Sequence, residues 1–482
     1  MLAPARGRLE PGSMTPTQTT AAGPRAADRF TPIQSIAMAV LLTANLTLAI
    51  DFSILTVALP HIGRELGFAT AALPWIVTSF ALCAAGFTLF FGRVADLFGR
   101  RRLFLAGMVL LGASSLLGGL AAGPVLLIAA RIGQGLATAM VTPAALALMT
   151  TMFPEGPARS RALGLNGALM AAGFTAGAVL GGLLTGAVSW RWAFFLNVAV
   201  ALLAVLVGPR VLHEPERAPR TRVDAAGAVT VTATLLALVL GVDLAGRSGW
   251  DDPAAAGLIL LALVLGAVFV LVETRAAAPL VDLALLRRRT VAGGNLAGLL
   301  AFATETALVF LLTLHLQEIL GFSAVAAGLI LGVLGLGTVI GGLLAPRVIC
   351  RIGAPATIVL GLLTQGAATA PLALLPASRG WLAALVLLAF LGGAANLVAI
   401  VGSVVTATSA VPGSQQGLAT GLVTMNQQVG IALGTPVLAA VATAVAATSL
   451  LGGLRLAIGV DALLCLLAAV LAAVLLRRAP RD

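Results

Sequence analysis

Two charged residues interrupt long apolar segments, and both are capable of proton or ion chemistry. Asp51 lies in the apolar segment 35–59, and Arg131 lies in the segment 125–150. An ionisable group inside a membrane-spanning helix is costly, so it is a functional candidate. Counted at ~1.5 Å per residue, both side chains fall roughly 10–12 Å below the same outer surface. They can therefore pair or share a water-filled cavity.

The chemistry of such a pair depends on its protonation. Burial in a dry cavity disfavours the charged form of Asp51, whereas the guanidinium of Arg131 favours it. A carboxylate between these two influences can take up and release a proton, which is what proton coupling requires. The alternative is a permanent ion pair that ties two helices together. Gln134 and Thr138 follow Arg131 at helical spacing, and we expect them to share its face.

A third acid, Glu305, lies in the apolar segment 291–315 between two threonines. It can contact a cationic or amine-bearing substrate, act as a second proton site, or be a protonated acid that hydrogen-bonds a neighbouring helix. Asp243 and Asp461 are predicted to be solvated helix ends. Four further amides can line a cavity in the second half or only bond helix to helix: Asn295, Asn396, Asn426 and Gln427.

A short basic connection, GRVADLFGR, occupies residues 92–100 between two apolar segments. Glycine at both ends is expected to make the turn, and the arginines favour the cytoplasmic side. The aspartate can accept hydrogen bonds from those arginines. The hypothesis is that this connection stabilises one of two alternating states, and the alternative is a purely topological loop. Its key residues are Gly92, Arg93, Asp96, Gly99 and Arg100.

Composition indicates that lipid surrounds most of the chain. Of 482 residues, 60% are hydrophobic and 10% are charged. A spanning helix needs roughly 20 mostly apolar residues. We predict an all-α integral membrane protein with fourteen such spans, at 35–59, 71–91, 103–122, 125–150, 162–188, 192–212, 225–245, 255–273, 291–315, 325–345, 355–376, 381–407, 418–446 and 455–476.

An even number of spans places both termini on one side of the membrane. All 29 basic residues are arginine, and most of them fall in connections on that side, so both termini are predicted to be cytoplasmic. The five tryptophans fall at the opposite, outer interface. Residues 1–33 are predicted to be a disordered cytoplasmic tail, and residues 477–482 a second tail.

The chain also resembles itself. Asp51–Pro74 aligns without gaps with Glu305–Gly328, which pairs the two acids. Because the copies run in the same direction, residues 34–212 and 291–476 are predicted to form parallel six-helix bundles. Residues 213–290 then supply linkers and an inserted pair of helices. Parallel six-helix halves with a substrate path between them are a known transporter plan.

Several function classes have no support in the sequence. It contains no Ser-His-Asp grouping and no phosphate-binding loop, and its three histidines are scattered. We therefore expect no enzyme activity, no cofactor and no metal site. The net charge of +11 is explained by arginines in the cytoplasmic connections and does not indicate nucleic-acid binding. The cysteines imply no disulfide framework, because Cys83 and Cys465 fall in helices and Cys350 in a cytoplasmic loop.

Several motifs resemble those of the fourteen-helix drug:proton antiporters of the major facilitator superfamily. Segment 51–60 (DFSILTVALP) is similar to the first-helix motif of that family, residues 92–100 to its loop motif, and segment 130–136 (ARIGQGL) to its Arg-x-x-Gln-Gly motif. The resemblance covers nearly all of residues 35–476. The antiporter motif has Ala178 in place of its proline, and its glycines are Gly173, Gly177, Gly181 and Gly182.

This resemblance implies a major facilitator fold and a proton-coupled exporter of amphipathic drugs, antibiotics or related small molecules that works by alternating access. The expected partners are a small-molecule substrate, protons and the lipid bilayer. The expected location is the inner membrane of a bacterial cell, and the expected state is a monomer. The alternatives are a proton-coupled symporter that imports a small solute, for which the missing proline leaves room, and a membrane enzyme or sensor.

Overall fold

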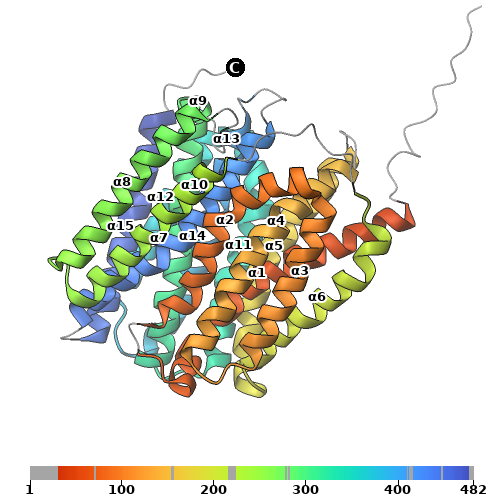
Figure 1. Cartoon of the computed structure of the whole chain (residues 1–482). Helices are drawn as coiled ribbons and strands as arrows, with labels where there is room; N and C mark the ends of the chain where they lie inside the picture. Colours follow the sequence, from red (N-terminus) through yellow and green to blue (C-terminus); the bar gives the residue numbers. More distant parts are fainter. Residues whose placement is uncertain are drawn as a thin grey trace, which may run out of the picture.

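Long helices make up almost all of the molecule (Figure 1). The computed structural model describes residues 31–69, 72–152, 157–214, 224–276, 279, 283–409, 411, 416–446 and 449–476. Within those ranges it contains no β-strand, as the all-α prediction requires. The predicted tails lie outside the described residues except at residues 31–33. There the prediction of disorder is wrong, because Pro32 and Ile33 begin the first helix and the Thr31 side chain caps it in a reciprocal capping box with Gln34.

The helices of the first repeat pack into one bundle. They are α1 (Pro32–Leu66), α2 (Pro74–Phe98), α3 (Arg100–Gly119), α4 (Pro124–Met152), α5 (Pro157–Ala187) and α6 (Arg191–Val211). Helix α4 packs on α2 and α3, while α1 packs on α5 and α6. Helix α1 therefore lies inside the bundle, with its middle surrounded by other helices.

The helices of the second repeat pack in the same way. They are α10 (Arg289–Leu314), α11 (Ala324–Ile352), α12 (Ala354–Thr369), α13 (Leu382–Ser409), α14 (Gln416–Ala446) and α15 (Leu450–Leu476). A π-helical turn, η2 (His315–Ile319), extends α10, and 3₁₀ turns η3 (Ala370–Leu374) and η4 (Arg379–Trp381) lie between α12 and α13. Helix α10 packs on α13, α14 and α15.

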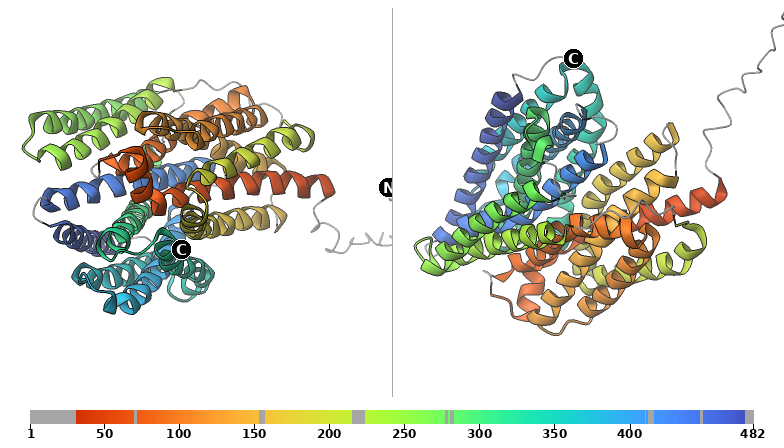
Figure 2. Two further views of the ribbon diagram at one scale, coloured as in Figure 1. Left: turned by 90° about the horizontal axis from the view of Figure 1, so that it is seen from below. Right: turned by 45° about the horizontal axis from the view of Figure 1, so that its top comes forward.

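The inserted helices lie beside the two bundles (Figures 1 and 2). They are α7 (Ala225–Ser248) and α8 (Pro253–Arg275), followed by the short α9 (Leu283–Leu286). Helix α7 contacts both bundles: the Thr232 hydroxyl donates to the Gly86 carbonyl of α2 at 2.8 Å, and the Thr443 hydroxyl of α14 donates to the Gly246 carbonyl at 3.0 Å. It therefore covers the seam between α2 and α14.

The number of long helices agrees with the fourteen predicted membrane spans. In the described part of the chain, twelve helices are long and apolar enough to cross a membrane, and α2 and α5 complete the fourteen predicted elements. Several helices, among them α1 and α11, are longer than the predicted apolar segments. Helix α1 continues beyond its apolar segment to Leu66, so Asp51 lies roughly 22 Å from the end of the helix. Cys350, predicted in a loop, lies in α11.

The predicted hinge is mostly helix. Gly92 lies inside α2, so the prediction that it makes a turn is wrong. The turn is at Gly99 alone, whose φ of +111° is a conformation that disfavours a side chain. Arg100 begins α3 directly afterwards. The side chains of Arg93 and Asp96 lie outside the described residues, so a gating role for this connection stays a hypothesis.

Candidate transport site

Asp51 and Arg131 form a buried ion pair at the centre of the first bundle. Nη1 of Arg131 lies 2.7 Å from Oδ2 of Asp51, and the two side chains are 0% and 1% exposed. The structure thus brings together the two residues whose matching depth suggested contact. Removing two charges from water is costly, and the attraction between them offsets that cost only when their remaining hydrogen bonds are satisfied.

The guanidinium is held from several directions. Its Nε donates to the carbonyl of Ile76 at 2.9 Å, and Nη1 also donates to Oε1 of Gln134 at 2.8 Å. The ring of Phe80 lies 4.3 Å from the guanidinium carbon. Helices α2 and α4 approach this closely because Gly135 has no side chain: a Cβ there would overlap the Phe80 carbonyl. The glycine of the Arg-x-x-Gln-Gly motif therefore positions its arginine.

The second carboxylate oxygen of Asp51 accepts two amides. Gln134 donates to Oδ1 at 3.2 Å, and Asn197 of α6 donates to the same atom. Gln134 also donates to the Ser115 hydroxyl of α3 at 2.9 Å, whereas Thr138 only bonds its own helix backbone. The site therefore draws on α1, α2, α3, α4 and α6. Sequence reasoning missed Asn197 and Ser115, although an amide inside the apolar segment 192–212 was a usable signal.

The antiporter-motif glycines hold α1 in place. Three of them face α1, where an added Cβ would overlap atoms of that helix: Gly173, Gly177 and Gly181. At Gly181 the overlapped atom is the Ile54 carbonyl oxygen. Helix α5 therefore packs directly against the helix that carries Asp51. Gly182 instead packs across the bundle interface, where a Cβ would lie 2.6 Å from the Ala324 carbonyl of α11. One glycine stripe thus links the charged site to the contact between bundles.

The bundles meet at the end of the molecule where α1 ends and α11 begins. Arg64 Nη1 lies 3.0 Å from Glu318 Oε1, and Gln317 Nε2 donates to the Val57 carbonyl at 2.7 Å. Arg64 and Glu318 are 254 residues apart, the offset that pairs Asp51 with Glu305. This ion pair therefore joins equivalent positions of the two repeats. The ribbons of the bundles spread apart toward the opposite end (Figure 2, right).

Glu305 does not share the surroundings of its equivalent, Asp51. It is 7% exposed in α10, and its Oε1 is buried without a hydrogen-bond partner among the described residues. No basic side chain of the described chain forms a salt bridge with it. The repeat therefore places an acid at the same position of both bundles but gives a counter-ion to only one.

Amides predicted to line a cavity form two small networks between helices. Asn426 of α14 donates to Asn295 of α10 at 2.9 Å, and the neighbouring Gln427 is half-buried. In α13, Asn396 donates to Gln365 at 3.2 Å, and Gln365 donates to the Thr304 hydroxyl at 3.1 Å. The bonds between helices are observed, and a role toward a substrate remains a proposal.

One expectation for the outer ends is wrong. Asp461 is 0% exposed rather than solvated, because α15 begins at Leu450 and carries the acid roughly 16 Å into the bundle. Trp190 lies at the start of α6, at the predicted outer end, but its ring is buried, and its Nε1 donates to Glu65 at 2.6 Å. The side chain of Asp243 lies outside the described residues.

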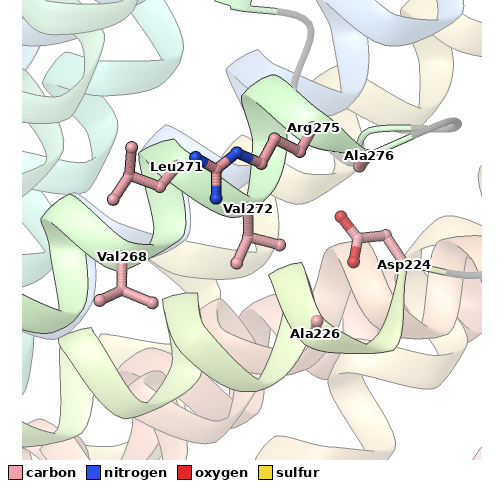
Figure 3. A pocket seen from close by; sticks show the side chains of 7 residues that line it. All are labelled: Asp224, Ala226, Val268, Leu271, Val272, Arg275 and Ala276. Atoms are coloured by element: carbon pink, nitrogen blue, oxygen red, sulfur yellow. The ribbon is translucent and has the colours of Figure 1, made fainter.

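One open cavity of about 460 Å³ lies away from these residues (Figure 3). It is formed by the start of α7 and the end of α8, with Asp224 and Arg275 at its rim and an apolar wall that includes Val268 and Val272. It shares no residue with the Asp51 site. In the described part of the chain, no group of three or more histidine, cysteine, aspartate or glutamate residues has a geometry that would hold a metal ion.

The sequence pattern that defines the Major Facilitator Superfamily matches residues 41–286 and 294–482. The chain belongs to this superfamily. The transporter is 37% identical over 420 residues to a puromycin resistance protein of Streptomyces alboniger, which covers 86% of this chain and 82% of that protein. It is 35% identical over 421 residues to a lincomycin resistance protein of Streptomyces lincolnensis, at 86% of both. A cephamycin export protein of Amycolatopsis lactamdurans is 43% identical over 302 residues, which is 62% of each chain.

Solved structures agree on the fold. The transporter matches the human organic anion transporter MFSD10 with a TM-score of 0.62 at 20% identity, covering 92% of this chain and 100% of that one. It matches a peptide transporter with a TM-score of 0.68 at 17% identity, covering 93% and 97%. The three relatives named above are antibiotic export and resistance proteins, and superfamily members are transporters rather than enzymes.

Proposed function

We propose that the protein is a proton-coupled exporter of antibiotics or related amphipathic small molecules, and that Asp51 is its coupling acid. The observation that carries the proposal is the Asp51–Arg131 pair, which is buried and hydrogen-bonded by five helices of one bundle. A buried acid beside a fixed cation is a group whose charge state changes its contacts. Its helix also contacts the other bundle.

The proton step follows from the contacts of Asp51. As a carboxylate it accepts hydrogen bonds from Arg131, Gln134 and Asn197. When a proton from the outer side binds one oxygen, the carboxyl loses its charge and gains a donor, so it no longer matches three donors. Arg131 is then left without its counter-ion. Release of the proton to the inner side restores the pair.

Helix α1 links this step to the bundle contact. From Asp51 it runs to Val57 and Arg64, both of which contact η2 of the other bundle. A shift of α1 when Asp51 changes charge therefore acts directly on the contact between bundles. We propose that this linkage makes protonation and substrate access alternate.

The remaining residues receive supporting roles in the same proposal. Glu305 contacts an amine or cationic group of the substrate, because its buried carboxyl group lacks a basic partner among the described residues and gains one when such a group binds. Asn295, Asn396 and Asn426 contribute polar contacts from the second bundle. The protein works as a monomer in the inner membrane of a bacterial cell with both termini in the cytoplasm, and residues 34–212 and 291–476 are its two moving halves.

Transport in proteoliposomes tests direction and coupling. Puromycin and lincomycin are the first probes because relatives confer resistance to them, with a cephamycin and tetracenomycin C as further probes. We expect export of at least one to carry protons the opposite way, and Asp51→Asn to abolish gradient-driven export while the protein still inserts. Proton movement in the same direction as the probe would identify a symporter. Preserved coupled export in Asp51→Asn would reject Asp51 as the coupling acid.

A further inference from the structure

The second bundle contains a buried acid that the proposed function does not use. Asp461 of α15 is 0% exposed, and neither of its carboxylate oxygens has a hydrogen-bond partner among the described residues. It belongs to the stripe of α15 that faces the bundle, and leucines and valines occupy the opposite, exposed face. A buried carboxylate without partners is strongly disfavoured as an anion, so its occurrence here needs an explanation.

The repeat shows which residue of the first bundle Asp461 corresponds to. Arg191, at the start of α6, donates to the Ala121 carbonyl at 3.0 Å, and Arg455 of α15 donates to the Leu375 carbonyl at 2.9 Å. Ala121 and Leu375 are separated by the same offset as Arg64 and Glu318. The two arginines therefore hold equivalent anchors at the outer end.

Counting from these anchors gives the equivalence. Asn197 follows Arg191 by the same number of residues as Asp461 follows Arg455. Asn197 is the amide that donates to the coupling acid Asp51. Asp461 therefore occupies, in the second bundle, the position that touches the charged site in the first.

The surroundings of Asp461 are the second-bundle version of that site. Thr369 corresponds to Ser115 by the repeat offset, and its buried hydroxyl also has no described partner. It lies near the depth of Asp461, because a Cβ on Gly366 would lie 3.2 Å from the Ala462 carbonyl and one on Gly459 would lie 3.8 Å from Ala373. Two unpartnered polar groups thus lie at one level between α12 and α15.

The position of the counter-ion is apolar in this bundle. Gly393 packs on the Leu334 carbonyl as Gly135 packs on that of Phe80. Ala389, one turn before Gly393, then stands where the first bundle has Arg131. Asp461 consequently has no equivalent of the cation that stabilises Asp51.

The elements packed against α15 supply few charges. These elements are α10, α12, α14, η2 and η3, and of these α12, α14 and η3 contain no titratable residue. The titratable residues on the others and nearby on α15 itself are Arg289, Glu305, His315, Glu318, Arg455 and Cys465. Arg455 is bonded to Leu375, and the Cys465 thiol lies within hydrogen-bonding reach of the Thr304 hydroxyl. Burial without a partner or a nearby free cation favours the neutral, protonated form of Asp461.

We propose that Asp461 is a second proton-binding site, so that each bundle carries one acid that gains and loses a proton. The proposal extends the proposed proton coupling, on which it rests for its place in a transport cycle. In the conformation described, the carboxyl O–H bond is intact. When α12 and α15 separate, water enters, accepts the proton and leaves a hydrated carboxylate. Helix α12 ends at Thr369 and continues as the 3₁₀ turn η3, so the backbone hydrogen-bonding pattern changes directly after this hydroxyl.

Infrared titration of the purified full-length protein in liposomes tests this without any substrate. A protonated carboxyl has a C=O stretching band that disappears on ionisation, and carbon-13 aspartate labelling separates aspartate bands from that of Glu305. We expect a labelled band that falls as pH rises and exchanges in heavy water. It is retained in Asp51→Asn and absent in Asp461→Asn. Asp251→Asn is the matched control, because Asp251 is exposed in the connection between α7 and α8.

Two results would overturn the proposal. One is an identical titration in the wild type and in Asp461→Asn. The other is an Asp461 band that stays constant over the whole pH range in which the protein remains folded, since a purely structural acid gives that result. Asparagine keeps the shape of the neutral acid and is the residue found at the equivalent position 197, so Asp461→Asn is expected to fold. If it does not, Asp461→Glu gives the same assignment, because it keeps a carboxyl group at this position but removes it from the labelled aspartates. Loss of coupling in Asp51→Asn is measured separately and leaves this titration unaffected.

Discussion

Removing one partner of the Asp51–Arg131 pair should destabilise the protein far more than removing both. The pair is completely buried, with 2.7 Å between its closest atoms. Asp51→Asn or Arg131→Met alone leaves one uncompensated charge inside the bundle, and such changes cost about 3–5 kcal/mol. If the two effects were independent, the double variant would lose about 6–10 kcal/mol.

The double variant should instead recover most of that loss, because no buried charge remains in it. What it still loses is the bond from Arg131 to the Ile76 carbonyl and part of the amide contacts around Asp51. An unsatisfied buried polar group costs about 1–3 kcal/mol. We therefore expect the double variant to unfold within about 1–3 kcal/mol of the wild type, and to be inactive in gradient-driven export.

Unfolding of the purified protein in detergent, followed for the four members of this cycle, gives the interaction energy. Asp251→Asn serves as a control that removes an exposed charge. Transport in proteoliposomes with an imposed pH gradient, with puromycin as the first probe, gives the functional readout. Additive losses would show that the charges do not depend on each other. A double variant that is stable and still couples protons to export would show that the pair is only structural.

Two further changes probe how α1 is held. Gly181→Ala should lower both the thermal unfolding temperature and the transport rate, because the added Cβ would overlap the Ile54 carbonyl. Gly257→Ala is the control and should leave both near wild type, because its Cβ would meet nothing within 4 Å. Equal behaviour of the two variants would contradict this packing argument. Arg64→Glu should weaken closure of the bundles, because the new carboxylate repels Glu318. A labelling reagent added from the outer side should then reach the central site more readily. The double variant Arg64→Glu with Glu318→Arg should restore closure of the bundles. The ion pair should contribute only about 0.2–1 kcal/mol to closure, because it is partly exposed. If the double variant does not recover, this pair does not act as a gate.

Much of the fold could be predicted from the sequence for simple physical reasons. A helix that crosses the lipid bilayer needs an apolar segment of a minimum length, so the number of helices can be counted from the apolar segments of the sequence. Charges inside such segments are rare because they are costly, which is why Asp51, Arg131 and Glu305 stood out. The repeat identified equivalent positions before any contact was known. The helix ends were missed: α1 continues to Leu66 through polar residues held by contacts such as that between Trp190 and Glu65, and apolarity does not report such extensions.

Only the tertiary structure decided which polar groups meet. Both Asp51 and Glu305 occupy the same position of their repeats, yet one has an arginine partner and the other does not. Asp461 lies in the interior although its place in the sequence suggested a helix end. The physical reason is that these helices are apolar on nearly every face, so the sequence carries little information about their rotation. Rotation is set where glycines let backbones touch, as Gly135 and Gly181 do, and those contacts involve residues that are distant in the chain.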